Sequence, residues 1–196
     1  CLRGLRELCD DNGILLILDE VQCGVGRTGK FFAHEWSGVT PDIMMVAKGI
    51  GGGFPLGAVL ATENAAFGMT EGTHGSTYGG NPLACAVGCS VIEQIVNPGF
   101  LEEVRSKSAL LIKKLKCLVT THTEIFEDVR GYGLMLGLKC KLQNTEVIAA
   151  CYNEKLITVP AADNVIRLLP PLNLGEDEID QAILRLDSAA SSFKKS

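Results

Sequence analysis

Two side chains in this sequence, one amine and one carboxylate, each directly follow a short apolar segment. Lys48 follows Ile43-Met44-Met45-Val46-Ala47 and precedes Gly49-Ile50-Gly51-Gly52-Gly53. Asp19 follows Ile14-Leu15-Leu16-Ile17-Leu18. Apolar runs of this length are typical of buried strands, and ligands bind outside the carboxyl ends of the strands in open parallel sheets. A lysine in that position can form a Schiff base with an aldehyde, so the pair suggests carbonyl chemistry.

The same pair meets the requirements of a pyridoxal phosphate site. Lys48 would bind the aldehyde, and Asp19 would keep the ring nitrogen protonated so that the ring accepts electrons. Gln22, which follows Asp19 by three positions, would then reach the phenolic oxygen of the ring. Each residue has a simpler interpretation, because a lysine at a strand end can point into water and an aspartate can cap a turn. The prediction of a pyridoxal phosphate enzyme rests on their combination.

Two further segments carry groups that bind anions. Ser76 and Thr77 lie among glycines ahead of a predicted helix, where hydroxyl and backbone N–H groups can bind a phosphate. An ordinary polar loop is the simpler interpretation. Arg167 lies in the apolar segment 165–169, where a buried guanidinium without a partner would be costly. It either reaches solvent or binds an anion such as a substrate carboxylate, and the sequence leaves both open.

Other kinds of site find little support. Gly24-Val25-Gly26-Arg27-Thr28-Gly29 has the glycine spacing of a dinucleotide site, but it does not open directly into a helix as that motif requires. A nicotinamide-dependent dehydrogenase is therefore a weak alternative. The three histidines are isolated and none of the eight cysteines lies at zinc spacing, so we expect no metal site.

Composition narrows the class of protein. A net charge of -5 with no basic stripe argues against nucleic acid binding. No apolar run approaches the roughly 20 residues that span a bilayer, so we expect no membrane segment. Most cysteines fall at apolar positions of predicted helices and strands, which suggests reduced core thiols and a cytoplasmic protein. The chain starts without Met inside a predicted helix at 2–11, which suggests a fragment of a longer protein.

The order of predicted elements is that of an α/β fold. After the two strands and a further short strand at 58–61, Asn81-Pro82 is typical of a helix start, and that helix should run to about Val96. Asn97-Pro98-Gly99 breaks the chain there. We predict one domain over 1–96 and a smaller α/β domain over 97–196. The second contains helices at 100–121, 145–154 and 176–191, a strand pair around 129 and 134–139, and a strand near 165–169.

Three long motifs together resemble those of the class III aminotransferases, which are fold-type-I pyridoxal phosphate enzymes. The motifs are 19–29, 47–57 and 75–82, and their order and spacing agree with that family over nearly the whole chain. Within that family, the residues of these motifs are most similar to those of the acetylornithine aminotransferase branch. The resemblance implies that residues 1–96 are the remainder of a large domain with a mostly parallel sheet, and that residues 97–196 are the small C-terminal α/β domain.

The resemblance also implies a role for each candidate residue. Lys48 would form the internal aldimine with pyridoxal 5'-phosphate and move the proton during the reaction. Asp19 would pair with the pyridinium nitrogen, and Gln22 would contact the ring oxygen. Thr77, with Ser76, would reach the phosphate bound by the neighbouring subunit of a homodimer with shared active sites. Arg167 would bind a carboxylate of the amino donor or of 2-oxoglutarate.

The activity expected from the resemblance is transfer of an amino group from N-acetylornithine to 2-oxoglutarate, in arginine biosynthesis. Succinylornithine, N-succinyl-diaminopimelate and ornithine are alternative donors, and a non-catalytic binding protein on the same fold is an alternative of another class. Members of the family are roughly twice as long as this chain, which corresponds to their C-terminal half. We therefore expect the 196-residue chain to be catalytically silent unless it is joined to the other half.

Overall fold

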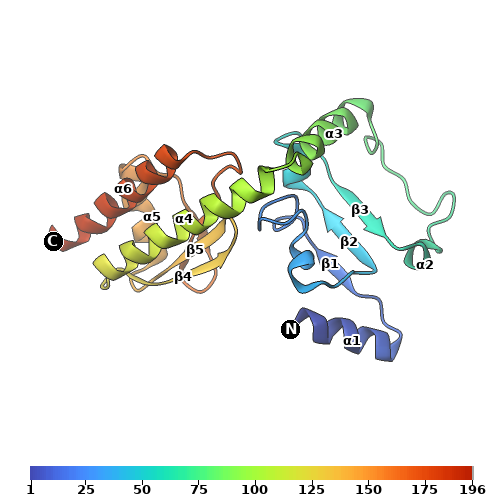
Figure 1. Ribbon diagram of the computed structural model, residues 1–196, viewed down its shortest axis with the longest axis horizontal. Helices are drawn as coiled ribbons and strands as arrows, with labels where there is room; N and C mark the ends of the chain where they lie inside the picture. The colour runs from blue at the N-terminus through green and yellow to red at the C-terminus, as the bar shows by residue number, and fades with distance from the viewer. Residues whose placement is uncertain (196) are drawn as a thin grey trace. The chain divides into compact units, whose positions relative to one another are not determined.

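The computed structural model describes residues 1–195, which form two compact units. The first unit is Cys1–Leu101 and the second runs from Glu102 onward. Each unit combines helices with its own sheet, as Figure 1 shows. The sequence placed the domain boundary near Asn97, which lies in the short break between helices α3 (Pro82–Val96) and α4 (Phe100–Thr121). The assignment of 1–96 and 97–196 as the large-domain remainder and the small domain stays a prediction.

The first unit contains a three-stranded sheet with short helices around it. Its elements in chain order are α1 (Leu2–Asn12), β1 (Ile17–Asp19), the 3-10 helix η1 (Ala33–Ser37), β2 (Ile43–Val46), the 3-10 helix η2 (Lys48–Gly51), β3 (Ala58–Ala61), α2 (Glu63–Ala66) and α3.

The sheet brings the ends of β1 and β2 to one rim. The two strands are parallel, with Ile17 opposite Ile43 and Asp19 opposite Met45. Their carboxyl ends therefore lie at the same edge of the sheet, where the sequence predicts that a ligand binds. Strand β3 runs antiparallel to β2, with Val59 opposite Met45, so one of the two strand pairs is parallel. The connection from β2 to β3 holds only the short helix η2 and turns, and a parallel return would need a longer crossover.

Strand β1 is shorter than the predicted strand over 14–18. The N–H of Ile14 donates to the carbonyl of Cys9 and so caps helix α1. The N–H of Leu16 donates to a carboxylate oxygen of Asp42 at 2.7 Å, and its carbonyl accepts from the N–H groups of Asp42 and Ile43. These hydrogen bonds occupy backbone groups of Ile14 and Leu16, which the sequence assigned to a regular strand. Pairing of β1 with β2 therefore begins only at Ile17.

Cap residues define one end each of α1 and α3, and the start of α3 is the one predicted from the sequence. Gly13 ends α1 in the left-handed conformation with φ 64°, which glycine adopts without steric cost. The side chain of Asn81 accepts a hydrogen bond from the N–H of Ala84 at 2.9 Å, and Pro82 is the first residue of α3. Helix α3 ends at Val96, as expected.

The second unit has a four-stranded antiparallel sheet in the order β4-β5-β7-β6. Its helices and strands are α4, β4 (Phe126–Tyr132), β5 (Met135–Cys140), α5 (Asn144–Asn153), β6 (Val159–Ala161), β7 (Val165–Leu168), α6 (Glu176–Ser192) and the 3-10 helix η3 (Phe193–Lys195). The three helices α4 to α6 and the strands β4, β5 and β7 follow the predicted positions closely.

Helix α4 buries one apolar face in the core of this unit. The buried apolar side chains on it are Val104, Leu111, Leu115 and Leu118, whose three-, four- and seven-residue spacing is that of one face of a helix. Full burial of each contributes about 1.5–3 kcal/mol relative to exposure. The hydroxyl of Ser108 donates to the carbonyl of Gly133 at 2.6 Å and so ties the helix to the turn between β4 and β5. Leu101, in the first turn of the helix, is half-buried.

Strand β6 was not predicted, and its composition explains why. Pro160 lies in its centre and lacks the N–H that a central strand needs. The strand is at the edge of the sheet, where that loss is tolerated. It is joined to β7 through a turn in which Asp163 and Asn164 have positive φ angles of 58° and 53°. The Asn164 amide fixes this turn by donating to the carbonyls of Cys140 and Leu142 at 2.8 and 2.7 Å.

The prediction that most cysteines are core residues was wrong. All eight are free thiols, but only Cys140 and Cys151 are buried, while the exposed ones are Cys1, Cys85, Cys89 and Cys117. Their positions on predicted helices gave no information about which helix face would be covered. Burial raises the pKa of Cys140 to about 11, so this thiol stays protonated at neutral pH.

No single helix among residues 1–195 is long and apolar enough to cross a membrane, although α3 and α4 would qualify together by length and composition alone.

Candidate functional site

Lys48 is the first residue of η2, immediately beyond the end of β2. Ala47 before it is extended, and Lys48 itself has φ 47°, a left-handed conformation that is uncommon for a residue with a side chain. The turn is closed by hydrogen bonds from the N–H of Ile50 to the carbonyl of Ala47 and from the N–H of Gly52 to the carbonyl of Gly49, at 3.2 and 3.1 Å. Backbone strain of this kind occurs where surrounding contacts fix the conformation, and it is frequent at functional sites.

Asp19 is the last residue of β1 and is exposed. Its Oδ1 accepts a hydrogen bond from the N–H of Val21 at 2.9 Å, which closes a local turn. The turn-capping role that the sequence left open is therefore present. The second carboxylate oxygen remains available for a cation, since one accepted bond uses only part of the acceptor capacity of a carboxylate.

Lys48 and Asp19 lie at the same rim of the sheet. Asp19 is opposite Met45, the second-last residue of β2, and Lys48 follows the end of β2 by two residues. Lys48 also lines a cavity of about 420 Å³ together with Gly53, Phe54, Pro55 and Leu56. An exposed amine beside a cavity, with a carboxylate on the neighbouring parallel strand, is a donor set that fits pyridoxal phosphate. The structure thus places these two predicted residues at the ends of adjacent parallel strands, and their roles toward a cofactor stay predictions.

Gln22, Ser76 and Thr77 are placed by loops. Gln22 is half-buried and follows β1 by three residues. Ser76 and Thr77 belong to the exposed segment 71–80, which leads to α3. The hydroxyl oxygen of Ser76 accepts a hydrogen bond from the N–H of Gly79 at 2.9 Å, which shapes the turn before the helix. The roles of these three residues toward a cofactor stay predictions.

Arg167 lies in the second unit, on β7. It is half-buried, opposite Gly137 of β5 and Val159 of β6. Gly137 contributes no side chain beside it, and a Cβ there would come within 2.5 Å of Val165. Its role as a substrate carboxylate site stays a prediction.

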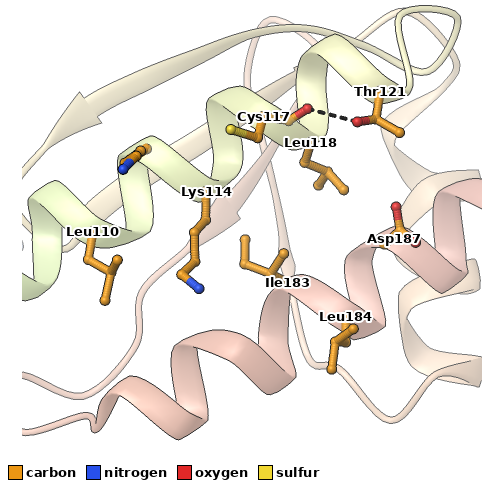
Figure 2. Close-up of a pocket in the computed structure, with 9 residues that line it drawn as sticks. Leu110, Lys114, Cys117, Leu118, Thr121, Ile183, Leu184 and Asp187 are labelled. Atoms are coloured by element: carbon orange, nitrogen blue, oxygen red, sulfur yellow. Dashed lines mark hydrogen bonds between the residues drawn. The ribbon is translucent and has the colours of Figure 1, made fainter.

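A different cavity, of about 470 Å³, lies between α4 and α6 in the second unit (Figure 2). Leu118 of α4 and Ile183 of α6 lie on facing sides of it, and Lys114 projects from α4 toward α6. None of the candidate residues named from the sequence lines it. Among residues 1–195, no three His, Cys, Asp or Glu side chains gather in a way that would hold a metal ion.

The sequence did not single out Glu20, which is only 2% exposed. Its carboxylate accepts hydrogen bonds from the N–H groups of Ala33 and His34 at 2.7 and 2.8 Å. Successive side chains at a strand end point to opposite faces, so an exposed Asp19 implies that Glu20 points inward. That alternation was a usable signal, but it does not identify the N–H groups that the carboxylate meets.

A family model described as aminotransferase class-III matches residues 1–190. The chain is 64% identical over 193 residues to the acetylornithine aminotransferase of Rhodobacter capsulatus, covering 98% of this chain and 49% of that protein. It is 58% identical over 192 residues to the acetylornithine aminotransferase of Mesorhizobium japonicum, with 98% and 48% covered. The chain therefore spans about half the length of these relatives.

Solved structures with the same fold are also aminotransferases. The N-acetylornithine aminotransferase of Stenotrophomonas maltophilia superimposes with a TM-score of 0.89 at 35% identity, over 99% of this chain and 51% of that one. The ornithine aminotransferase of Toxoplasma gondii superimposes with a TM-score of 0.92 at 28% identity, over 99% of this chain and 47% of that one.

Proposed function

Because the chain belongs to the class-III aminotransferases, we propose that its full-length protein transfers the amino group on the terminal carbon of N-acetylornithine to 2-oxoglutarate, in arginine biosynthesis. The observation that carries this proposal is the pair of Lys48 and Asp19 at the ends of adjacent parallel strands. The choice of donor is supported by the 64% identity to the Rhodobacter capsulatus acetylornithine aminotransferase.

The family depends on pyridoxal 5'-phosphate, and the fold is that of the fold-type-I enzymes. When bound, pyridoxal phosphate supplies an electron-poor ring that stabilises negative charge on the substrate carbon. Lys48 would hold the cofactor covalently through Nζ and, once released, would remove the proton from the substrate carbon as a general base. Asp19 would accept a hydrogen bond from the ring nitrogen and favour its protonated form. Both roles need the rim position that β1 and β2 provide.

The remaining candidate residues would bind and orient. The amide of Gln22 would donate to the ring oxygen. Arg167 would bind a carboxylate of 2-oxoglutarate through two parallel hydrogen bonds, a geometry that lysine cannot provide. Thr77, with Ser76, would donate hydrogen bonds to a phosphate.

We assign residues 1–96 to the cofactor-binding domain and residues 97–196 to the small domain. We place the protein in the cytoplasm, which its free thiols support.

The choice of donor is tested with the full-length gene product and pyridoxal phosphate in single-turnover absorbance measurements. We expect N-acetylornithine to convert the cofactor to its amine form, and 2-oxoglutarate to restore it. N-acetylornithine should give a kcat/KM at least about tenfold above ornithine, because a site that binds the acetyl amide loses hydrogen bonds with the free amine. A higher kcat/KM for succinylornithine, N-succinyl-diaminopimelate or ornithine would keep the chemistry and replace the donor. Cofactor binding without conversion by any of them would favour a non-catalytic protein.

Sharing of active sites in a homodimer is tested by complementation between two variants. Lys48→Ala removes the amine of its own site, while Thr77→Val removes a hydroxyl that we expect to serve the site of the neighbouring subunit. A mixed dimer then has one site with both groups intact. Co-expression of equal amounts should recover about a quarter of the wild-type activity, because half of the dimers are mixed and each has one complete site. Activity no greater than that of the two variants measured separately would contradict a shared site.

A further inference from the structure

Glu20 is a buried carboxylate beside the candidate site, and the proposed chemistry gives it no role. It is 2% exposed, and burying a charge is costly unless hydrogen bonds compensate. Both of its oxygens are used, since Oε2 accepts from the N–H of Ala33 at 2.7 Å and Oε1 accepts from the N–H of His34 at 2.8 Å. Ala33 and His34 are the first two residues of η1, whose N–H groups have no partner within that helix. The carboxylate therefore fixes the start of η1 against the end of β1.

The backbone of Glu20 makes two more connections. Its N–H donates to the carbonyl of Met45 at 2.9 Å, which extends the pairing of β1 with β2 past Asp19. Its carbonyl accepts from the N–H of Gly24 at 3.0 Å. Met45 lies near the end of β2 and precedes Lys48 by three residues. Glu20 therefore links three segments, which are the end of β2, the glycine loop at residues 24–29 and η1.

The glycine loop extends this connection to the turn formed by Lys48 and Gly49, called the lysine turn below. A Cβ on Gly24 would lie 2.8 Å from the carbonyl oxygen of Glu20, so only glycine fits there. Val25 has φ 55°, which is an outlier for a β-branched residue, and it is 2% exposed. Its Cβ lies 3.4 Å from where a Cβ of Gly49 would be, so Val25 packs directly against the residue that follows Lys48. Strained conformations on both sides of this contact require support from their surroundings.

We propose that Glu20 is a positioning residue, which acts through Gly24 and Val25 to hold the Lys48–Gly49 turn in register with Asp19. This inference rests on the proposed function for its effect on catalysis, and on the contacts above for its effect on the turn. A cap of η1 alone would need only the carboxylate, whereas the bonds to Met45 and Gly24 join that cap to the two strand ends that carry the amine and the acid.

The test compares three variants of the full-length gene product. Glu20→Gln keeps the size of the side chain but replaces one accepting oxygen with a donating amide group, which faces an N–H of Ala33 or His34. Val25→Gly removes the side chain that packs on Gly49 and tolerates the positive φ. Glu35→Gln is the matched control, because Glu35 is an exposed carboxylate whose Oε1 accepts from the N–H of Phe32 at 2.8 Å beside the same helix.

Hydrogen exchange without cofactor is the first measurement. We expect Glu20→Gln and Val25→Gly to increase exchange over residues 48–54 by about tenfold, while Glu35→Gln leaves it unchanged. Two further measurements follow. The first is reductive trapping of pyridoxal phosphate on Lys48, detected by peptide mass, and the second is the kinetics of the reaction with N-acetylornithine as donor. Displacement of the amine should slow trapping and lower kcat by about 10- to 100-fold, with KM within about threefold of wild type.

The outcomes separate this proposal from the proposed function. If Glu20→Gln and Val25→Gly both show the same hydrogen exchange over residues 48–54 as the wild type, the positioning role is overturned, whatever their activity. Equal effects of Glu20→Gln and Glu35→Gln overturn it as well, since both would then act only on η1. If Glu20→Gln fails to fold, Val25→Gly decides the question. A wild-type protein without trapping or transamination refutes the proposed function, and the exchange measurement still decides the link from Glu20 to the lysine turn.

Discussion

Lys48→Ala is expected to lower the rate of half-transamination by about 10³-fold or more, because it removes both the covalent attachment of the cofactor and the general base. The fold should survive. Lys48 is exposed, and alanine retains the Cβ, so the strained φ of 47° is neither relieved nor worsened. The measurement is single-turnover absorbance with N-acetylornithine, together with reductive trapping of the cofactor and peptide mapping.

Lys30→Ala is the matched control for Lys48→Ala. Lys30 is in the same unit, and its Nζ lies 5.5 Å from the ring centre of Trp36, so its loss removes the same charge without touching the strand ends. We expect near wild-type rates for this variant. If Lys48→Ala retained more than about a tenth of the wild-type rate, or if trapping mapped to another lysine, the assignment of Lys48 would be wrong.

Asp19→Asn is expected to lower kcat by about 10²–10³-fold, which is the typical cost of removing one preorganised electrostatic partner. Asparagine has nearly the same shape, and its Oδ1 can still accept from the N–H of Val21, so the turn after β1 should remain. What is lost is the negative charge that favours the protonated ring nitrogen. The measurements are kcat, KM and the pH dependence of the absorbance of the bound cofactor.

Asp11→Asn provides the comparison for Asp19→Asn, because Asp11 is an exposed carboxylate on α1 in the same unit. It should change neither kcat nor the pH dependence. An Asp19→Asn protein with wild-type kcat would mean that Asp19 serves only to cap its turn. Loss of kcat together with a lower unfolding temperature would also count against the electrostatic role, which leaves folding intact.

Helix positions were well predicted because their signals are local. The spacing of Val104, Leu111, Leu115 and Leu118 marks one helix face, and that face is buried whichever sheet it meets. Asn81 and Pro82 fix the start of α3 through bonds within one turn. Strand β6 was missed for the opposite reason, since Pro160 argues against a strand and only the edge position in the sheet permits it.

For the candidate site, the sequence by itself determined the chemical groups and the ends of strands at which they lie. Lys48 and Asp19 follow apolar runs, and the length and order of those runs place both residues at one rim of a sheet. Only the tertiary structure decided that Glu20 is buried while Asp19 is exposed, and that Val25 and Lys48 adopt positive φ. The physical reason is that both outcomes depend on contacts between segments distant in sequence. The N–H groups of Ala33 and His34 stabilise the buried carboxylate, and the packing of Val25 against Gly49 supports the strained turn.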